Sequence, residues 1–171
     1  MHLIIDGYNL LHVGRSLVSM TALELEGRRN QLIEQLSSYR HTRPCDVTIV
    51  FDGWQGGWAF EKKERRKGID VIFSRLGERA DEVVKRLAKE KGAGAVVVTS
   101  DREIASYAER LAVAVIPSEV FRGKLERSVS QGHKEIARNG AEETRSGAKR
   151  KGPSRRLSKK EKRRQAVLKK L

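Results

Sequence analysis

The sequence has very little cysteine, and Cys45 is the single one among 171 residues. This excludes an internal disulfide and favours a reducing compartment such as the cytoplasm. Long apolar runs are also missing, and the longest, near residues 93–98, is far below the roughly 20 residues that span a membrane. A strand-like segment follows Met1 directly, so a secretion signal is not expected here. We predict a soluble, cytoplasmic protein without membrane contact.

Motifs for several common chemistries are missing too. The histidines show no spacing typical of zinc ligands; they are His2, His12, His41 and His133. The phosphate-binding pattern G-x-x-x-x-G-K-[ST] is absent, and the glycine-rich residues 92–94 precede a predicted strand instead of following one. ATP hydrolysis and dinucleotide binding are therefore not expected.

The whole chain has a formal net charge of +14. Acidic residues are scarce in only one part of it. Residues 1–121 hold 18 lysines and arginines against 17 acidic residues, whereas residues 122–171 hold 18 against 5. A nearly neutral domain followed by a basic, partly helical extension favours RNA or the ribosome as partner. A solubilising or disordered tail is the alternative. The candidate RNA-binding residues of the extension are Arg155, Arg156, Lys159 and Lys160.

Short β-branched runs alternate with helical patterns in the first domain. Strands are predicted at residues 2–6, 46–52, 69–74, 95–99 and 112–116. Helices are predicted at residues 23–39, 81–91, about 102–111, 118–138 and 158–171. Because the strands are nearly continuous apolar runs, we expect an α/β fold in which helices cover both faces of a mostly parallel sheet of about five strands. The pattern assigns no element to residues 54–68.

Four aspartates lie where predicted strands end or helices begin. Asp6 follows the first strand, Asp52 the second and Asp101 the fourth. Asp81 opens the helix that follows the third strand. Ligands of open parallel sheets bind at the carboxyl ends of the strands, so all four side chains can meet at one edge.

Each aspartate also has a purely structural explanation. Asp6 and Asp52 precede glycines in ordinary turn dipeptides, and Asp81 suits the positive end of a helix. Ser100 is expected to cap the next helix, in a capping box with Glu103. These explanations weaken when they are taken together, because asparagine or serine would serve equally well and aspartate stands at all four positions.

A shared cation would explain the repeated choice of aspartate. Several carboxylates within ~6 Å repel one another unless a cation neutralises them. Hard oxygen ligands without a histidine or cysteine cluster favour Mg²⁺ or Mn²⁺ over zinc. Such an ion activates water for in-line attack on a phosphodiester and stabilises the leaving oxygen. The predicted metal ligands are Asp6, Asp52, Asp81 and Asp101, with Asp6 and Asp101 first because their strands flank the expected switch point.

Four motifs at these positions resemble a known family. They are IIDGYNLL (4–11), VFDG (50–53), IFS (72–74) with RADEVVKRL (79–87), and VVVTSDREI (96–104). In this order and spacing they are similar to the YacP-like branch of the NYN domain, within the PIN-like nuclease superfamily. The resemblance covers about residues 1–125, and the basic extension resembles that branch less specifically.

The resemblance implies a three-layer α/β/α PIN-like fold, a divalent-metal site and endoribonuclease activity, with mRNA cleavage in association with the ribosome. It places catalytic or metal-binding carboxylates at the same four aspartates. Asn9 would be a catalytic-site residue that orients a carboxylate, a water or a phosphate, although from the sequence alone a plain turn asparagine is about as good an explanation.

Residues 54–68 supply further candidate RNA contacts. Trp54 lies in a glycine-rich loop beside the predicted site, where it would stack on an unpaired base or pack into the core. A run of basic residues would follow a phosphate backbone, and a solvated helix face explains the same run nearly as well. The basic residues are Lys62, Lys63, Arg65 and Arg66.

Two other functions remain open. A non-catalytic RNA-binding protein on a PIN-like scaffold would share the basic extension, but it gains nothing from acidic groups that face phosphates. A small-molecule phosphohydrolase would share the metal chemistry and leave the extension unexplained. Oligomeric state is not predicted by any feature of the sequence.

Overall fold

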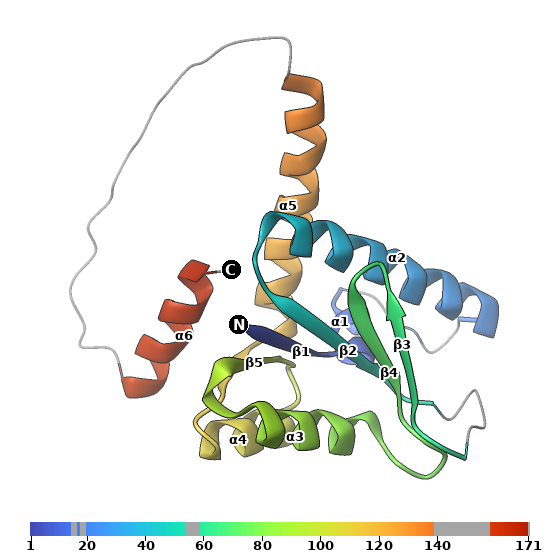
Figure 1. Ribbon diagram of the computed structural model, residues 1–171, viewed down its shortest axis with the longest axis vertical. Coiled ribbons are helices and arrows are strands. Elements are labelled where there is room, and N and C mark those ends of the chain that lie inside the picture. The colour runs from blue at the N-terminus through green and yellow to red at the C-terminus, as the bar shows by residue number, and fades with distance from the viewer. Residues whose placement is uncertain (15–16, 18–19, 54–58, 139–157, 171) are drawn as a thin grey trace.

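Residues 1–14, 17, 20–53, 59–138 and 158–170 are described by the computed structural model in Figure 1, apart from the side chains of residues 129–138, 159, 160 and 170. The strands are β1 (His2–Asp6), β2 (Asp46–Phe51), β3 (Lys62–Arg66), β4 (Ile69–Phe73), β5 (Ala95–Val98) and β6 (Ala114–Ile116). The helices are α1 (Gly7–His12), α2 (Ala22–Thr42), α3 (Ala80–Lys91), α4 (Arg102–Arg110), α5 (Ser118–Arg138) and α6 (Lys159–Lys170). A short 3₁₀ turn (Gly92–Gly94) precedes β5.

The described strands form one sheet in the order β3-β4-β2-β1-β5-β6. All neighbours are parallel except β3 and β4, which are antiparallel. β1 therefore lies between β2 and β5 at the centre of the sheet. Its side chains are almost completely buried because helices cover both faces, as the continuous apolar pattern predicts.

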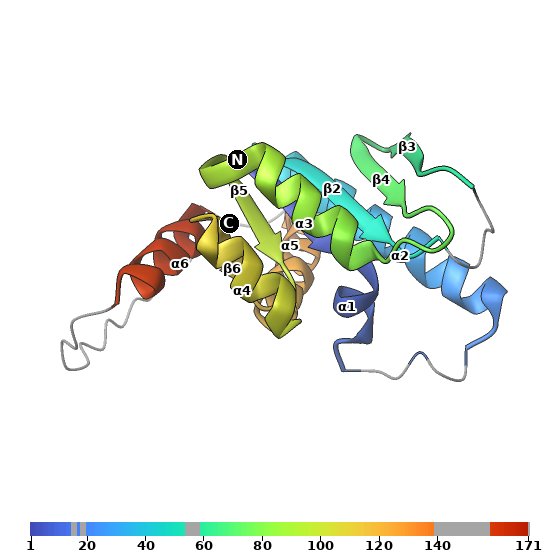
Figure 2. The same ribbon diagram turned by 90° about the horizontal axis from the view of Figure 1, so that it is seen from below.

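Two apolar cores lie on opposite faces of the sheet. Leu3 and Ile5 of β1 point into the core that α1, α2 and α5 cover, whereas Ile4 points into the core beneath α3 and α4. Figure 2 shows α3 and α4 on one side of the strands and α5 on the other. The α/β fold with a mostly parallel sheet between two helical layers is confirmed.

The structure adds a sixth strand to the five that the sequence predicts. β3 forms a hairpin with β4 through Lys67 and Gly68, whose φ angles are 50° and 80°. Two consecutive positive φ angles are typical of the tight turns that join antiparallel strands. The sequence of β3 is KKERR, and such charged edge strands resist pairing with other chains. The basic run is therefore a strand and not a helix face.

Helix α1 was also not predicted. It begins at Gly7, directly after Asp6, and a Cβ atom at Gly7 would lie 2.4 Å from a ring carbon of Phe51. The glycine is therefore required by the close approach of α1 to β2, and the Asp-Gly pair is not an ordinary turn.

Helix α5, which crosses the predicted boundary at residue 121, and helix α6 both pack onto the first domain. Phe121 and Leu125 of α5 are fully buried in the core with α2. Val167 and Leu168 of α6 pack against the same core, and the Lys124 Nζ atom donates to the Leu168 carbonyl over 2.7 Å. The division of the chain into a first domain and an extension at residue 121 stays a prediction. Within the described part of the chain, every helix is too short or too polar to cross a bilayer.

Candidate active site

All four predicted aspartates lie at the carboxyl edge of the sheet. Asp6 is the last residue of β1, and Asp52 directly follows β2. Asp101 lies three residues beyond the end of β5 and directly before α4. Asp81 is the second residue of α3. The central position of β1 between β2 and β5 places these chain segments next to one another, as the parallel arrangement predicts.

Asp6 is the most buried of the four, with 7% of its surface exposed. It caps α1: its Oδ1 atom accepts a hydrogen bond from the Asn9 backbone N–H over 3.2 Å. Its Oδ2 atom accepts one from the Thr99 hydroxyl, also over 3.2 Å. Burial raises the pKa of Asp6 to about 6, against these hydrogen bonds, and the charges of Asp81 and Asp52 raise it further. The carboxylate is therefore a desolvated charge at neutral pH.

Asp52 joins the end of β2 to the start of α3. Its Oδ1 atom accepts a hydrogen bond from the Ala80 N–H over 2.6 Å. The adjacent Gly53 N–H donates to the Ser74 hydroxyl, and a Cβ atom at Gly53 would lie 1.8 Å from the Ser74 carbonyl oxygen. Glycine is thus required for close contact between the segments that follow β2 and β4, and this contact fixes the position of Asp52.

Asp101 caps α4, and this corrects the predicted capping box. The Oδ1 atom of Asp101 accepts hydrogen bonds from the N–H groups of Glu103 (2.7 Å) and Ile104 (3.1 Å). The Ser100 hydroxyl instead donates to Glu119 over 2.7 Å. The capping residue is therefore Asp101 and not Ser100, because the first helical residue is Arg102.

Asp81 lies within electrostatic range of the other three. Burial raises its pKa, Asp101 and Asp52 raise it further, and Arg79 and Lys85 oppose the shift. The charge of Asp81 in turn raises the pKa of Asp6. Among the residues that the structure describes, none of the four aspartates forms an ion pair with a lysine or arginine.

Asn9 ties two loops of the site together. Its Oδ1 atom accepts hydrogen bonds from the Ser100 N–H (2.8 Å) and from the Ser118 hydroxyl (2.7 Å). Its backbone N–H holds Asp6. Asn9 thus connects the end of β1 to the start of α4 and to α5, so it is more than a turn asparagine.

The described aspartates do not form a closed metal cage. In the described part of the chain, no group of three or more histidine, cysteine, aspartate or glutamate side chains is close enough to hold an ion. The charge of Asp52 nevertheless raises the pKa of both Asp6 and Asp81, and the charge of Asp101 raises the pKa of Asp81.

Sequence comparison assigns the chain to a family. The family model for the YacP-like NYN domain matches residues 3–170. The chain belongs to this family. The resemblance in the four motifs is thus confirmed, and the match extends through α6. NYN domains are PIN-like, nuclease-type domains.

Known relatives support the family assignment. The uncharacterised protein YacP of Bacillus subtilis strain 168 is 32% identical over 87 residues, which cover 51% of each protein. The match therefore spans about half the length of that relative. A crystal structure of a mutant Rae1 (YacP) from Bacillus subtilis superimposes with a TM-score of 0.68 and 21% identity, and covers 85% of this chain and 87% of that one. A second Rae1 (YacP) crystal structure from Bacillus subtilis superimposes with a TM-score of 0.59 and 25% identity, and covers 81% of this chain and 83% of that one. The PIN-like fold of the YacP-like NYN domain is confirmed.

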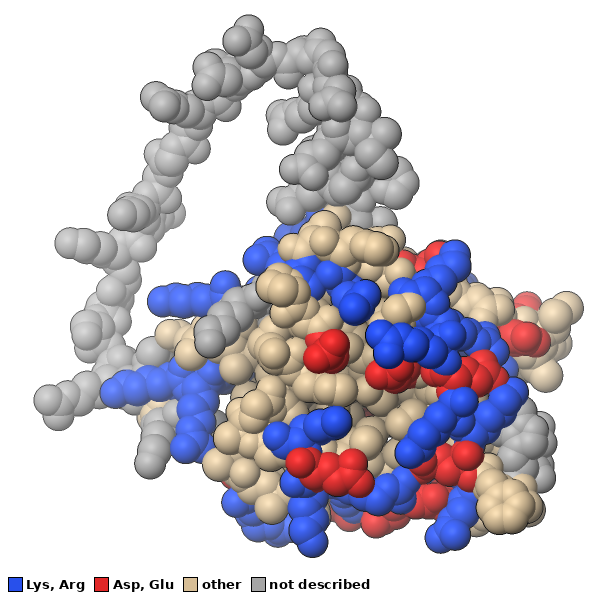
Figure 3. Space-filling model, in the orientation of Figure 1, with Lys and Arg blue, Asp and Glu red and all other residues tan. Residues whose placement is uncertain are grey.

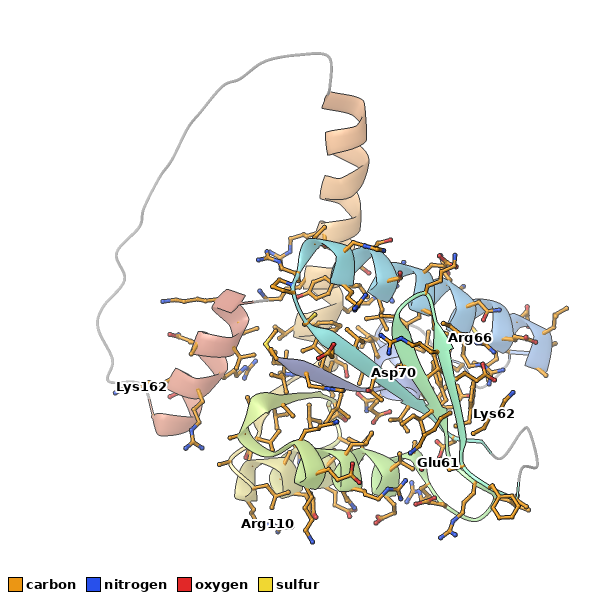
Figure 4. The ribbon with its side chains drawn as sticks, viewed as in Figure 1. Glu61, Lys62, Arg66, Asp70, Arg110 and Lys162 are labelled. Atoms are coloured by element: carbon orange, nitrogen blue, oxygen red, sulfur yellow. The ribbon has the colours of Figure 1, made fainter. Side chains whose placement is uncertain are left out.

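Four of the predicted RNA-binding residues of this NYN domain lie along β3. Lys62 pairs with Glu64, and Lys63 pairs with Glu61 over 3.1 Å. Figure 4 labels Lys62 and Arg66 on this edge strand, and Figure 3 shows acidic side chains interspersed with the basic ones over β3 and α2. Exposed ion pairs are weak, so a phosphate can replace the carboxylate partner. The other two basic residues of β3 are also paired: Arg65 with Asp70 (3.8 Å) and Arg66 with Glu64 (2.5 Å).

Other predicted contacts lie outside the described residues. They are Trp54, Arg155 and Arg156. Lys159 and Lys160 begin α6, and their side chains are also not described.

Sequence reasoning missed two residues that hold the candidate site together. Thr99 links two aspartates, because its hydroxyl donates to Asp6 and accepts from the Asp101 N–H over 3.1 Å. Ser118 bonds to Asn9 and to the Ser100 hydroxyl. Thr99 stands directly before Ser100 in the motif VVVTSDREI, which is a signal that the sequence offers. Ser118 had no comparable signal, because it is brought to the site only by the fold.

Proposed function

We propose that this YacP-like NYN domain is a divalent-metal-dependent endoribonuclease that cleaves RNA phosphodiester bonds. One observation carries the proposal: Asp6 is a buried carboxylate beside Asp52 and Asp81, and it has no ion-pair partner among the described residues. A desolvated carboxylate near others is costly unless a cation binds there. The family supports nuclease-type chemistry.

The donor atoms at the site fit Mg²⁺ or Mn²⁺. All are carboxylate oxygens, and histidine and cysteine ligands are not among the described groups near them. Mg²⁺ commonly takes only one or two carboxylates, and retains waters or substrate phosphate oxygens, so a cage of three protein ligands is not required. When bound, the ion would activate a water for in-line attack and stabilise the leaving oxygen. The proposed ligands are Asp6, Asp52, Asp81 and Asp101.

The protein's own residues orient these carboxylates. Thr99 and the Asn9 N–H fix both oxygens of Asp6, and helix starts fix one oxygen of Asp52 and one of Asp101. The other oxygens of Asp52 and Asp101 accept no hydrogen bond from a described residue. They are therefore available to an ion, and their orientation is set before the substrate binds.

The partner that fits this chemistry is RNA. The basic extension would attract a polyanion, and we propose mRNA as substrate, in association with the ribosome and in the cytoplasm. The candidate contacts along β3 and in the extension would bind phosphates on either side of the cleaved bond.

The proposal is tested by cleavage of a mixed single-stranded RNA pool during titration with Mg²⁺ and Mn²⁺. We expect cleavage only with divalent metal, and we expect Asp6→Asn to abolish it while RNA binding persists. The matched control is Asp70→Asn, on β4, because Asp70 is half exposed and pairs with Arg65 outside the site. Cleavage in excess chelator, or unchanged cleavage by Asp6→Asn, would refute the assignment.

A non-catalytic RNA-binding protein remains the second candidate. It is favoured by the structural hydrogen bonds of the aspartates and by the lack of a three-ligand group among the described residues. The same titration decides between the two, because an RNA binder would retain RNA without turnover at any metal concentration.

A further inference from the structure

Arg29 of α2 is held in a fixed position beside the candidate site. Its Nη1 atom donates to the Tyr8 hydroxyl oxygen over 3.0 Å, and its guanidinium carbon lies 5.6 Å from the centre of the Phe73 ring. Both partners are themselves held by Phe51: the Tyr8 ring packs edge-on at 5.3 Å, and the Phe73 ring stacks at 5.7 Å. A row of aromatic rings from the core thus orients the guanidinium.

Arg29 forms no ion pair with any aspartate or glutamate that the structure describes. Of its five N–H donors, one is used by Tyr8. An arginine that is pre-oriented, partly buried and without a carboxylate partner is suited to bind a phosphate with two parallel hydrogen bonds.

Arg29 lines a hollow that opens beside Asp52. The hollow has a volume of about 420 Å³, within the range of small-ligand sites, and is lined by residues of the first half of α2 and of the β3–β4 hairpin. The polar part of its lining includes Asn30 and Arg66, and also the carboxylates of Glu26, Asp52 and Glu64. Phe73 contributes little surface, because it is 6% exposed and Arg29 lies over its ring. Side-chain amide and guanidinium groups can form hydrogen bonds with the edge of a nucleobase.

We propose that Arg29 is a substrate-binding residue, whose guanidinium contacts an RNA phosphate next to the cleaved bond while the hollow that Arg29 lines holds the adjoining nucleotide. This inference rests on the proposed function, because it names how the same site binds its RNA. It also gives Tyr8, the tyrosine of the Asp-Gly-Tyr-Asn motif, a role as the positioning residue for Arg29.

The test measures binding without catalysis. A labelled single-stranded RNA oligonucleotide is titrated with full-length Asp6→Asn protein in chelator at several salt concentrations. Adding Arg29→Ala is expected to weaken binding about tenfold and to reduce the slope of log affinity against log salt by about 0.7, the value for one phosphate contact on a single strand. Arg28→Ala is the matched control, because Arg28 is the adjacent arginine and lines a different hollow with Leu11. It should leave affinity within twofold and the slope unchanged.

Two further variants separate positioning from folding. Tyr8→Phe keeps the ring and removes the hydroxyl, so in metal-loaded protein it should raise KM several-fold and leave kcat unchanged. Arg29→Gln retains most of the side-chain packing, and it replaces Arg29→Ala if that variant shows a lowered melting temperature. The inference would be overturned if the slope of log affinity against log salt were the same with arginine at position 29 and with its replacement. It would also be overturned if Arg28→Ala weakened RNA binding as much as Arg29→Ala does.

The outcomes also distinguish this inference from the proposed function. Arg29-dependent binding by a protein that never cleaves RNA would refute the nuclease proposal and retain the binding site. Metal-dependent cleavage that is unchanged by Arg29→Ala and Tyr8→Phe would retain the nuclease and refute the binding role.

Discussion

Replacing Asp6 with asparagine should stabilise the folded protein at neutral pH while it destroys the proposed metal site. The carboxyl group is 7% exposed, and its pKa is about 6 against an ordinary 3.8. A shift of about two units corresponds to about 3 kcal/mol of unfavourable ionisation in the folded protein. Asparagine has nearly the same shape without the charge. Altered hydrogen bonds to Thr99 and Asn9 would cost about 1 kcal/mol, which leaves a net gain of about 2 kcal/mol.

The sign of this effect follows from proton binding. Between about pH 4 and pH 6 the folded protein retains a proton on Asp6 that the unfolded chain has already released. The free energy of unfolding of the wild-type protein therefore falls as pH rises through this window. The Asp6→Asn protein lacks this dependence. Its advantage should be absent below about pH 4 and complete above about pH 6.

The assay is urea unfolding of both proteins in chelator across this pH range, with Asp70→Asn as the control. Adding Mg²⁺ at pH 7 should stabilise the wild-type protein and not Asp6→Asn, because only the former retains the buried ligand. Equal stability of the two proteins at pH 7, or a difference that does not change with pH, would show that Asp6 is not a destabilising buried charge.

Substitutions at two other positions, Asp101 and Gly53, test how the site is built. Asp101→Ala should lose about 1 kcal/mol with the helix cap, whereas Asp101→Ser should keep the cap; both should lose RNA cleavage, and retained cleavage by Asp101→Ser would contradict a metal-binding role. Gly53→Ala should cost more than about 3 kcal/mol, because its Cβ would lie 1.8 Å from the Ser74 oxygen. Gly27→Ala, in open space on α2, is the control for thermal unfolding and should not destabilise.

Hydrophobic pattern and strand-end position were sufficient to predict the parallel core. Strands β1, β2 and β5 are nearly continuous apolar runs that are buried on both faces, so a short apolar run is enough to identify each of them. The positions of Asp6 and Asp52 follow directly from the ends of those strands. The same reasoning could not find β3, because an edge strand has few buried residues and its sequence KKERR shows no apolar alternation.

Contacts between segments that are far apart in the sequence could not be predicted, because only the packing of the fold brings them together. Asn9 bonds to Ser118, 109 residues away, and Arg29 bonds to Tyr8 from another helix. Nothing in the local sequence around Arg29 distinguishes it from Arg28, since both lie on a polar stretch of the same helix. Which of two adjacent arginines meets the aromatic row depends on how α2 is rotated against the sheet, and only packing decides this.

The structural and functional explanations of the aspartates turn out to be compatible. Asp6, Asp52 and Asp101 each accept hydrogen bonds from backbone N–H groups at the start of a helix. Those N–H groups carry partial positive charge, so they stabilise a carboxylate that would otherwise be repelled by its neighbours. Asparagine or serine could satisfy the same donors, but neither would add a negative charge near the other aspartates. Capping therefore explains the orientation of each carboxylate, but it does not explain why the capping residue carries a negative charge.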